Sequence, residues 1–190
     1  NQDKNVGNIK DLLMAASDVD AYDVELDDVM QDMLANLQNK DKIEIKKQPK
    51  LLKATLRAYQ NRGVSWLGYL EGLGLNACLA DDMGLGKTLQ SIKAIEKLLN
   101  AGEISKILII SPISLIKTWK IELKKWSKMI AFASVDQQNT DSKQLLELFE
   151  NNQIIIANYE QIRKTDSYFS ILDFDLVVAD EAHKVRNTSS

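Results

Sequence analysis

A glycine-rich segment, residues 80–88, has the composition of a phosphate-binding loop. It reads Ala-Asp-Asp-Met-Gly-Leu-Gly-Lys-Thr. Gly84 and Gly86 allow backbone N–H groups to approach phosphate oxygens closely, and the start of the helix that follows adds about half a positive charge. Lys87 is expected to reach the terminal phosphates of a nucleotide, and Thr88 to offer its hydroxyl to Mg²⁺. We therefore predict a nucleotide-phosphate site in this segment.

An acidic turn near the end of the sequence complements this loop. Asp180, Glu181 and His183 come directly after the apolar run Leu176-Val-Val-Ala179. Acidic side chains at the carboxyl end of a buried strand lie where open α/β sheets bind their ligands. Asp180 is expected to hold the Mg²⁺ that Thr88 also contacts, and Glu181 to polarise the attacking water. For His183, a surface position without a catalytic role is the alternative interpretation.

Both segments depend on the elements around them. The strict phosphate-loop pattern has glycine where this chain has Asp81, so the assignment requires a strand before the loop and a helix after it. From residue 51 onward, short apolar runs alternate with segments whose apolar side chains recur at helical spacing. Strands are predicted over residues 76–80, 106–110, 153–157 and 175–179, and helices over residues 88–99 and 113–126. This alternation indicates an α/β fold with a mainly parallel sheet covered by helices on both faces.

The composition excludes several other classes of protein. The chain has 190 residues, of which 45% are hydrophobic, and this is enough for one sizeable core. No run approaches the roughly 20 apolar residues of a membrane span. No signal peptide is visible after Asn1, so the sequence reads as a piece of a longer protein. Because Cys78 is the only cysteine and His183 the only histidine, an internal disulfide and a Cys/His zinc site are excluded.

The net charge of −3 is an average over two unlike parts of the chain. Nine acidic residues against two lysines give residues 1–35 a charge of −7, which leaves +4 for the remainder. Apolar spacing predicts a helix over residues 26–37 of the acidic part. The basic run over residues 40–57 is interpreted either as a solvated face or as a surface that follows phosphates. The acidic part is either a solvated linker or a cover for that basic face.

The order and spacing of these motifs resemble the Swi/Snf-type ATPases of helicase superfamily two. The resemblance covers about residues 50–187. It depends on Leu56-Arg-Ala-Tyr-Gln60, residues 76–88, Ser111-Pro-Ile-Ser-Leu115, Ala157-Asn-Tyr-Glu160 and the sequence Asp-Glu-Ala-His at residues 180–183. Asp81 is similar to what this family carries at that position. Ala58 replaces the proline that is usual in the first motif, which should loosen its turn.

The resemblance implies a RecA-like lobe that binds ATP and Mg²⁺. Gln60 would read the adenine edge with Arg57 nearby, and a capped helix start is the alternative interpretation of Gln60. His183 would couple the nucleotide site to later motifs. The implied nucleotide contacts are Arg57, Gln60, Asp82, Met83, Gly84, Leu85, Gly86, Lys87 and Thr88. The implied metal ligands are Thr88 and Asp180, and the implied catalytic residues are Lys87, Asp180 and Glu181.

Two further groups of residues have competing interpretations. The family resemblance places Ser111, Pro112, Asn158 and Tyr159 along the path of one DNA strand, whereas ordinary strand ends would contain the same residue types. The tryptophans fit the apolar stripes of their helices and are predicted to be core residues rather than base-stacking ones. They are Trp66, Trp119 and Trp126.

The sequence therefore predicts the first, ATP-binding lobe of a Swi/Snf-type translocase that acts on double-stranded DNA. Residues 1–49 would form the acidic N-terminal segment, and residues 50–190 the lobe, without the second lobe that completes the site. Such a fragment is expected to bind nucleotide weakly and to hydrolyse little alone. The alternatives are a lobe of a helicase that unwinds RNA or single strands, and a non-catalytic module in which nucleotide stabilises the fold. The Asn-, Lys- and Ile-rich composition favours a bacterial, cytoplasmic protein; a eukaryotic one would be nuclear.

Overall fold

The computed structural model describes residues 56–72, 75–80, 84–127, 130–135, 141–164 and 166–183. The chain forms two compact units, residues 1–90 and 91–190, and their border falls within helix α4 (Lys87–Ala101). The predicted acidic helix over residues 26–37 and the predicted boundary after residue 49 lie outside the described residues, so both stay predictions. Among the described residues, no helix has the length and the apolar composition that a membrane span requires.

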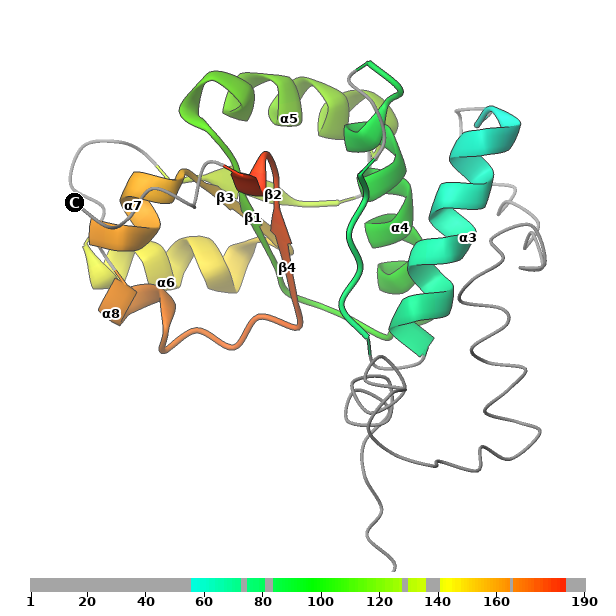
Figure 1. Cartoon of the computed structure of the whole chain (residues 1–190). Helices are drawn as coiled ribbons and strands as arrows, with labels where there is room; N and C mark the ends of the chain where they lie inside the picture. The colour runs from blue at the N-terminus through cyan, green and yellow to red at the C-terminus, as the bar shows by residue number, and fades with distance from the viewer. Residues whose placement is uncertain are drawn as a thin grey trace, which may run out of the picture. The chain divides into compact units, whose positions relative to one another are not determined.

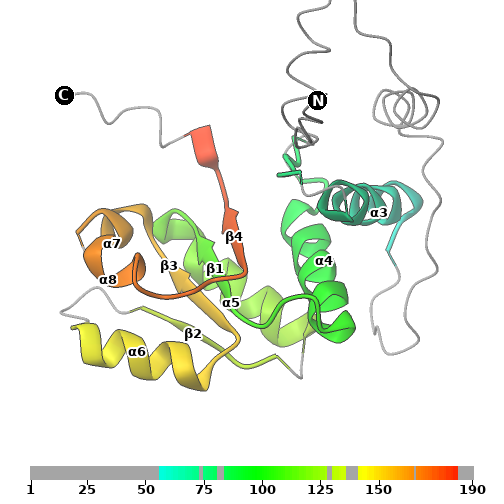
Figure 2. The same cartoon turned by 90° about the horizontal axis from the view of Figure 1, so that it is seen from below.

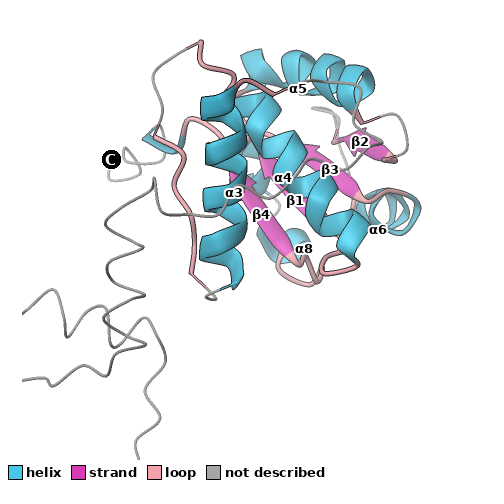
Figure 3. Cartoon of the chain, turned by 90° about the vertical axis from the view of Figure 1, so that its right-hand side faces the viewer, coloured by secondary structure: helices cyan, strands magenta, loops and turns pink. Residues whose placement is uncertain are grey.

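The second unit is built on a parallel sheet, whose described strands have the order β2-β3-β1-β4 (Figures 1 and 3). Ile107 of β1 pairs with Ile154 of β3 on one side and with Leu176 of β4 on the other. The strands are β1 (Ile107–Ile110), β2 (Phe132–Ser134), β3 (Ile154–Ala157) and β4 (Leu176–Ala179). The predictions of β1, β3 and β4 are confirmed to within a residue at their starts, whereas β2 was not predicted.

Helices cover both faces of this sheet, as predicted. Helix α5 (Ile113–Trp126) and the second-unit part of α4 pack on one face, and α6 (Ser142–Asn151) packs on the other (Figure 1). Helices α7 (Tyr159–Lys164) and α8 (Asp166–Phe169) lie side by side (Figure 2). The first core cluster contains Ile92, Ile95, Ile107, Ile109, Trp119, Leu123, Ile154 and Ile156, and the second contains Leu108, Val135, Leu145, Ile155, Ala157 and Phe169. Successive residues of β1 and β3 enter opposite clusters, which explains why these strands are apolar throughout.

Strand β4 was predicted to be buried on both faces, but the structure buries only one of them. Leu176 and Val178 are half-buried and pack against the first cluster, but Val177 is 53% exposed. In the described part of this unit, β4 has β1 on one side and no strand on the other. The sequence of β4 is as apolar as that of β1, so its local pattern did not distinguish an edge strand from a central one.

The first unit contributes helix α3 (Ala58–Gly72) and the residues around the glycine loop. The prediction of a strand over residues 76–80 is wrong: residues 75–80 are neither helix nor strand, and four of these six residues are exposed. A strand needs a neighbour that completes its backbone hydrogen bonds. The described residues of this unit contain no strand that could supply them.

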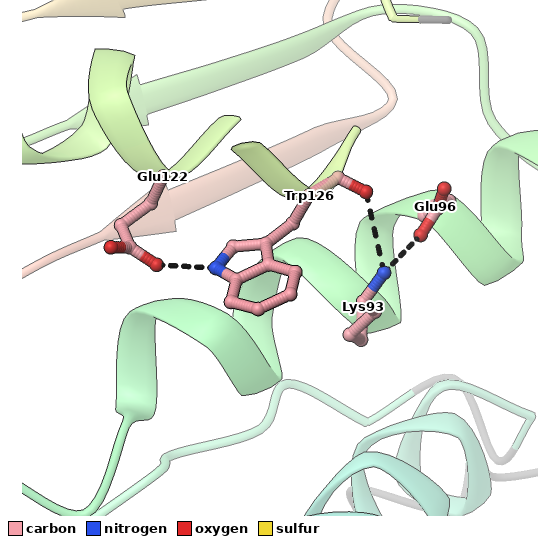
Figure 4. A network of polar contacts seen from close by, with 4 residues as sticks. All are labelled: Lys93, Glu96, Glu122 and Trp126. Carbon is pink, nitrogen blue, oxygen red and sulfur yellow. Dashed lines mark hydrogen bonds and ion pairs between the residues drawn. The ribbon is translucent and has the colours of Figure 1, made fainter. Parts of the chain in front are cut away.

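A buried lysine connects α4 to the end of α5 within the second unit (Figure 4). The side chain of Lys93 is almost fully buried, and its Nζ lies 2.9 Å from Oε2 of Glu96 and 3.4 Å from the backbone oxygen of Trp126. A buried ammonium group requires such partners because its transfer from water is costly. The contact also places a positive charge at the negative end of the α5 dipole. The orientation of α5, which contributes to the site below, is therefore fixed by a polar contact as well as by apolar packing.

Asp175 connects the starts of β1 and β4. Its Oδ2 accepts hydrogen bonds from the backbone N–H of Ser105 at 2.7 Å and of Lys106 at 2.9 Å, and from the Ser105 hydroxyl at 2.8 Å. The Lys106 N–H, followed by the bonds from Ser105, lowers the pKa of Asp175 below its ordinary value. The carboxylate is therefore bound more tightly than the carboxylic acid in the folded chain.

We predict that Asp175→Asn lowers the free energy of unfolding at pH 7 by about 1 kcal/mol, a value reduced for the solvent exposure of the site. Because the folded-state pKa is lowered, the stabilisation is present above the unfolded pKa and is lost as the pH falls through the folded one. The difference from the unmodified chain should thus shrink below about pH 4. Denaturant unfolding at neutral and acid pH measures this difference in the free energy of unfolding. The control is Asp173→Asn, which makes the same change at an exposed residue nearby. A difference that is independent of pH would contradict the prediction.

Candidate functional site

The glycine loop leads directly into α4, as the sequence predicts. Gly84 and Gly86 have φ angles of +82° and +78°, a conformation that L side chains disfavour. The N–H of Gln90 donates to the oxygen of Gly86 at 3.0 Å, so the hydrogen bonding of α4 begins at Gly86. In any α-helix, the N–H groups of the first turn lie outside the helix's own hydrogen-bond pattern, and Lys87 and Thr88 lie in the first turn of α4. Such a helix start can bind an anion such as a phosphate.

Gln60 connects the start of α3 to this loop. Its Oε1 accepts from the N–H of Arg57 at 3.0 Å, which is how a glutamine caps a helix start. Its Nε2 donates to the oxygen of Leu85 at 3.2 Å, and the Tyr59 hydroxyl donates to the same oxygen at 3.3 Å. A Cβ at Gly86 would lie 2.6 Å from this Nε2, which is a second reason for glycine there. These contacts support the helix-start interpretation of Gln60, and its adenine contact stays a prediction.

The remaining loop predictions have mixed outcomes. Arg57 and Leu85 are exposed, and Lys87 and Thr88 are half-buried. Asp82 and Met83, which the sequence also assigned to the nucleotide, lie outside the described residues.

In the second unit, Asp180 is held at three points at the carboxyl edge of the sheet. Its N–H donates to the oxygen of Ile110 at 2.8 Å, which continues the β1–β4 pairing by one residue. Its backbone oxygen accepts from the Tyr159 hydroxyl at 2.7 Å. Its Oδ2 accepts from Nε1 of Trp119 at 2.8 Å. The acidic turn is thus fixed by α5, α7 and β1 together.

Sequence reasoning missed the two side chains that hold Asp180. Trp119 was predicted to be a core residue, and this is confirmed because it is 2% exposed. Its hydrogen bond to Asp180 was not predicted. A buried indole N–H usually has a hydrogen-bond partner, so the predicted burial of Trp119 was a reason to look for one. Tyr159 was assigned to a DNA strand, but its hydroxyl is bonded within the chain.

The pKa of the Tyr159 hydroxyl is affected by the charges at this edge of the sheet. Its pKa is raised above the ordinary value, first by burial and then by the negative charges of Asp180 and Glu181. The hydroxyl therefore remains a protonated donor at neutral pH. The two carboxylates make this part of the sheet edge negative, which favours a cation.

Glu181 has an unusual backbone conformation. Its φ of +53° makes it the one residue other than glycine with a positive φ among those described. This conformation costs roughly 1–3 kcal/mol in a residue with a side chain and is often found at functional sites. Its Oε2 lies 3.2 Å from Nδ1 of His183, and these side chains are 28% and 68% exposed. Both side chains are thus accessible to solvent in part, and the coupling role of His183 stays a prediction.

The residues assigned to a DNA strand share the carboxyl edge of the sheet with Asp180. Ser111 follows β1 and is fully buried, and Pro112 precedes the first residue of α5. Asn158 follows β3, is 6% exposed and caps α7: its Oδ1 accepts from the Gln161 N–H at 2.8 Å, and Gln161 Oε1 accepts from the Asn158 N–H at 2.9 Å. These contacts support the strand-end interpretation. The DNA contact of these residues stays a prediction.

The family described as "SNF2-related domain" matches residues 59–190. This chain belongs to the SNF2-related family. It is 36% identical over 154 residues to "Nuclear protein STH1/NPS1" of Saccharomyces cerevisiae, covering 78% of the chain and 11% of that protein. It is 33% identical over 153 residues to "Helicase SWR1" of Gibberella zeae, covering 78% of the chain and 9% of that protein. The SNF2-related chain thus spans about a tenth of the length of these curated relatives.

Solved structures agree with this family assignment. The chain matches "Sulfolobus solfataricus SWI2/SNF2 ATPase core in complex with dsDNA" with a TM-score of 0.68 and 33% identity, over 77% of the chain and 30% of that structure. It matches the "Sulfolobus solfataricus SWI2/SNF2 ATPase core domain" with a TM-score of 0.66 and 32% identity, over 80% of the chain and 30% of that structure. The predictions of a Swi/Snf-type family and of a RecA-like α/β lobe with a parallel sheet are confirmed.

The described site residues of this SNF2-related lobe fall into two groups. The glycine loop, the start of α4 and Gln60 belong to the first unit, and the acidic turn with its supporting side chains belongs to the second. Within each group, backbone and side-chain hydrogen bonds fix the chemically important segment. These bonds act on the Leu85 oxygen in the first group and on Asp180 in the second.

Proposed function

We propose that the chain is the ATP-binding lobe of an ATPase that depends on double-stranded DNA. The observation that carries this proposal is the glycine loop that opens α4, in a chain 33% identical to an SWI2/SNF2 ATPase core whose structure was solved with dsDNA. The loop supplies the phosphate chemistry, and the family likeness supplies the expectation of a duplex. The chain spans 30% of that core, so the activity belongs to the full-length protein.

The residues of the first unit would bind the nucleotide. N–H groups in the first turn of α4, which follows the positive-φ residues Gly84 and Gly86, would donate to phosphate oxygens. Lys87 would neutralise the terminal phosphates, and Arg57 would lie near the base. Gln60 would act chiefly by holding the Leu85 carbonyl, so that the loop keeps its shape before nucleotide binds.

The donor groups of the chain fit Mg²⁺. Thr88 offers a hydroxyl oxygen and Asp180 a carboxylate oxygen, which are the hard ligands that this ion prefers. Among the described residues, no group of three or more His, Cys, Asp or Glu side chains could hold a metal without help. Mg²⁺ does not need such a group, because it binds through one or two carboxylates together with phosphate oxygens and retains several waters. We propose Thr88 and Asp180 as its ligands; the bound ion would neutralise charge on the phosphates.

Glu181 would orient and polarise the water that attacks the terminal phosphate. Its side chain is 28% exposed, and the residue directly follows Asp180 at the carboxyl edge of the sheet. His183, which contacts this carboxylate, would couple the turn to segments that close over the nucleotide. Closure around ATP and opening after hydrolysis would then move the protein along a duplex.

Two further parts of the proposal concern the activity of the 190-residue chain alone and the cellular location of the protein. We expect the 190 residues alone to bind nucleotide weakly and to hydrolyse little, because they match less than a third of the solved ATPase core. The two solved structures named above come from Sulfolobus solfataricus, and a yeast relative is named a nuclear protein. A nuclear location is the proposal for a eukaryotic source, and the bacterial cytoplasmic location stays a prediction.

Nucleic-acid stimulation of the ATPase tests the proposal. We expect duplex DNA to raise the hydrolysis rate of the full-length protein above its basal value, and single-stranded RNA of equal length to leave it unchanged. The assay follows phosphate release at saturating ATP and Mg²⁺. Stimulation by single-stranded RNA but not by duplex DNA would replace the proposal with the unwinding helicase.

A further inference from the structure

Trp119 differs from an ordinary core tryptophan in where its N–H points. Its ring lies in the apolar cluster with Leu123 and Ile109 and is 2% exposed. Its Nε1 lies 2.8 Å from Oδ2 of Asp180, 61 residues further along the chain. A helix on one face of the sheet thereby contacts the carboxylate at the sheet's edge.

A second tryptophan of α5 provides the contrast. Nε1 of Trp126 donates to Oε2 of Glu122 at 2.6 Å, one turn earlier in the same helix (Figure 4). That contact satisfies the indole locally and does not involve the acidic turn. The two indoles therefore have the same kind of bond, but only that of Trp119 reaches a residue assigned to the site.

The Trp119 contact completes the restraint of Asp180. The backbone of Asp180 is already fixed by Ile110 on its N–H and by Tyr159 on its oxygen. These two bonds act on the backbone, whereas the indole N–H donates to Oδ2 and so restrains the rotation of the carboxylate itself. Oδ1 is left out of this bond, so a cation could bind it without displacing the indole.

We propose that Trp119 is a positioning residue that orients the Asp180 carboxylate for Mg²⁺. This inference depends on the proposed role of Asp180 as a metal ligand. Side chains that hold a metal ligand in place typically change metal affinity or activity by about 10–100-fold when they are altered. The lobe would thus carry a ligand that is oriented before the nucleotide arrives.

The test replaces Trp119 with phenylalanine in the full-length protein and titrates Mg²⁺. We expect the Mg²⁺ concentration for half-maximal ATPase activity to rise about 10-fold or more. The same shift should appear in the Mg²⁺ dependence of binding of a fluorescent ATP analogue, measured without turnover. Trp126→Phe, which removes the other indole donor of α5, should leave both titrations unchanged.

A smaller ring could disturb the core, so a second variant preserves its shape. Benzothienylalanine at position 119 replaces the indole N–H by sulfur and retains the two fused rings. It should reproduce the Mg²⁺ shift while the thermal unfolding midpoint stays that of the unmodified protein. An unchanged Mg²⁺ titration in this variant would overturn the inference.

Asp180→Asn separates this inference from the proposed function. If Asp180→Asn shifts the Mg²⁺ titration and the position 119 variants do not, Trp119 is a core residue only and the inference fails. If Asp180→Asn leaves the titration unchanged, the assignment of Asp180 to the metal fails first, and the inference fails with it.

Discussion

Replacing Lys87 with alanine is expected to lower the ATPase rate of the full-length protein by about 10²–10³-fold, which is the size of effect seen when one donor to a developing negative charge is removed. The substitution leaves the backbone of α4 intact, because alanine is the best helix former. What is lost is the ammonium group at the first position of the helix that follows Gly86. Binding to duplex DNA should persist, since it would involve other parts of the protein. Phosphate release and a DNA-binding titration in the absence of nucleotide measure the two effects separately.

A matched control lies on the same helix. Lys97→Ala makes the same chemical change ten residues further along α4, away from the loop, and should leave both measurements unchanged. A Lys87→Ala protein that hydrolyses ATP at the normal rate would exclude the proposed phosphate contact. If that protein also retained every function of the unmodified one, a module in which nucleotide only stabilises the fold would be the better description.

The helices and strands that position the site were predictable from the sequence where the local pattern of apolar residues matches the burial of the element. Strands β1 and β3 are continuous apolar runs because both of their faces are covered, and α5 has a clear apolar stripe. The strand predicted over residues 76–80 failed because a strand also needs a hydrogen-bonding neighbour, which no local pattern encodes. For the same reason, the exposure of Val177 on β4 could not be read from its apolar sequence.

The local structure of the candidate site was predictable where consecutive residues determine it. The left-handed φ angles of Gly84 and Gly86 are ones that glycine permits, and the acidic turn follows a strand that its apolar run predicts. The contact between Trp119 and Asp180 could not be predicted in the same way, because 61 residues separate the pair. A tryptophan on an apolar stripe has the same pattern whether its N–H is bonded inside its own helix or across the sheet. The sequence therefore pointed to the glycine loop and the acidic turn, whose chemical roles stay predictions, but not to the side chain that orients Asp180.

Replacing Glu181 with glutamine is the second substitution for which a large effect is expected. The rate constant kcat for ATP hydrolysis should fall by about 10²–10⁴-fold, because the amide cannot accept a proton from the attacking water. Glutamine has nearly the same size and the same backbone preferences, so the cost of the φ of +53° is unchanged. ATP binding should persist, since this carboxylate is assigned to the water and not to the phosphates. Steady-state hydrolysis and binding of a fluorescent ATP analogue distinguish the two effects.

The control for Glu181→Gln must remove a negative charge from the same sheet edge without touching the turn. Glu160 meets this requirement, because it lies exposed in the first turn of α7, next to the tyrosine that holds Asp180. Glu160→Gln should therefore alter kcat little, and any effect it has measures the contribution of general electrostatics. A fall in kcat that is equal for the two variants would show that charge, and not a base at position 181, sets the rate. A fall confined to Glu181→Gln, with ATP binding retained, is the result that the geometry of the acidic turn predicts.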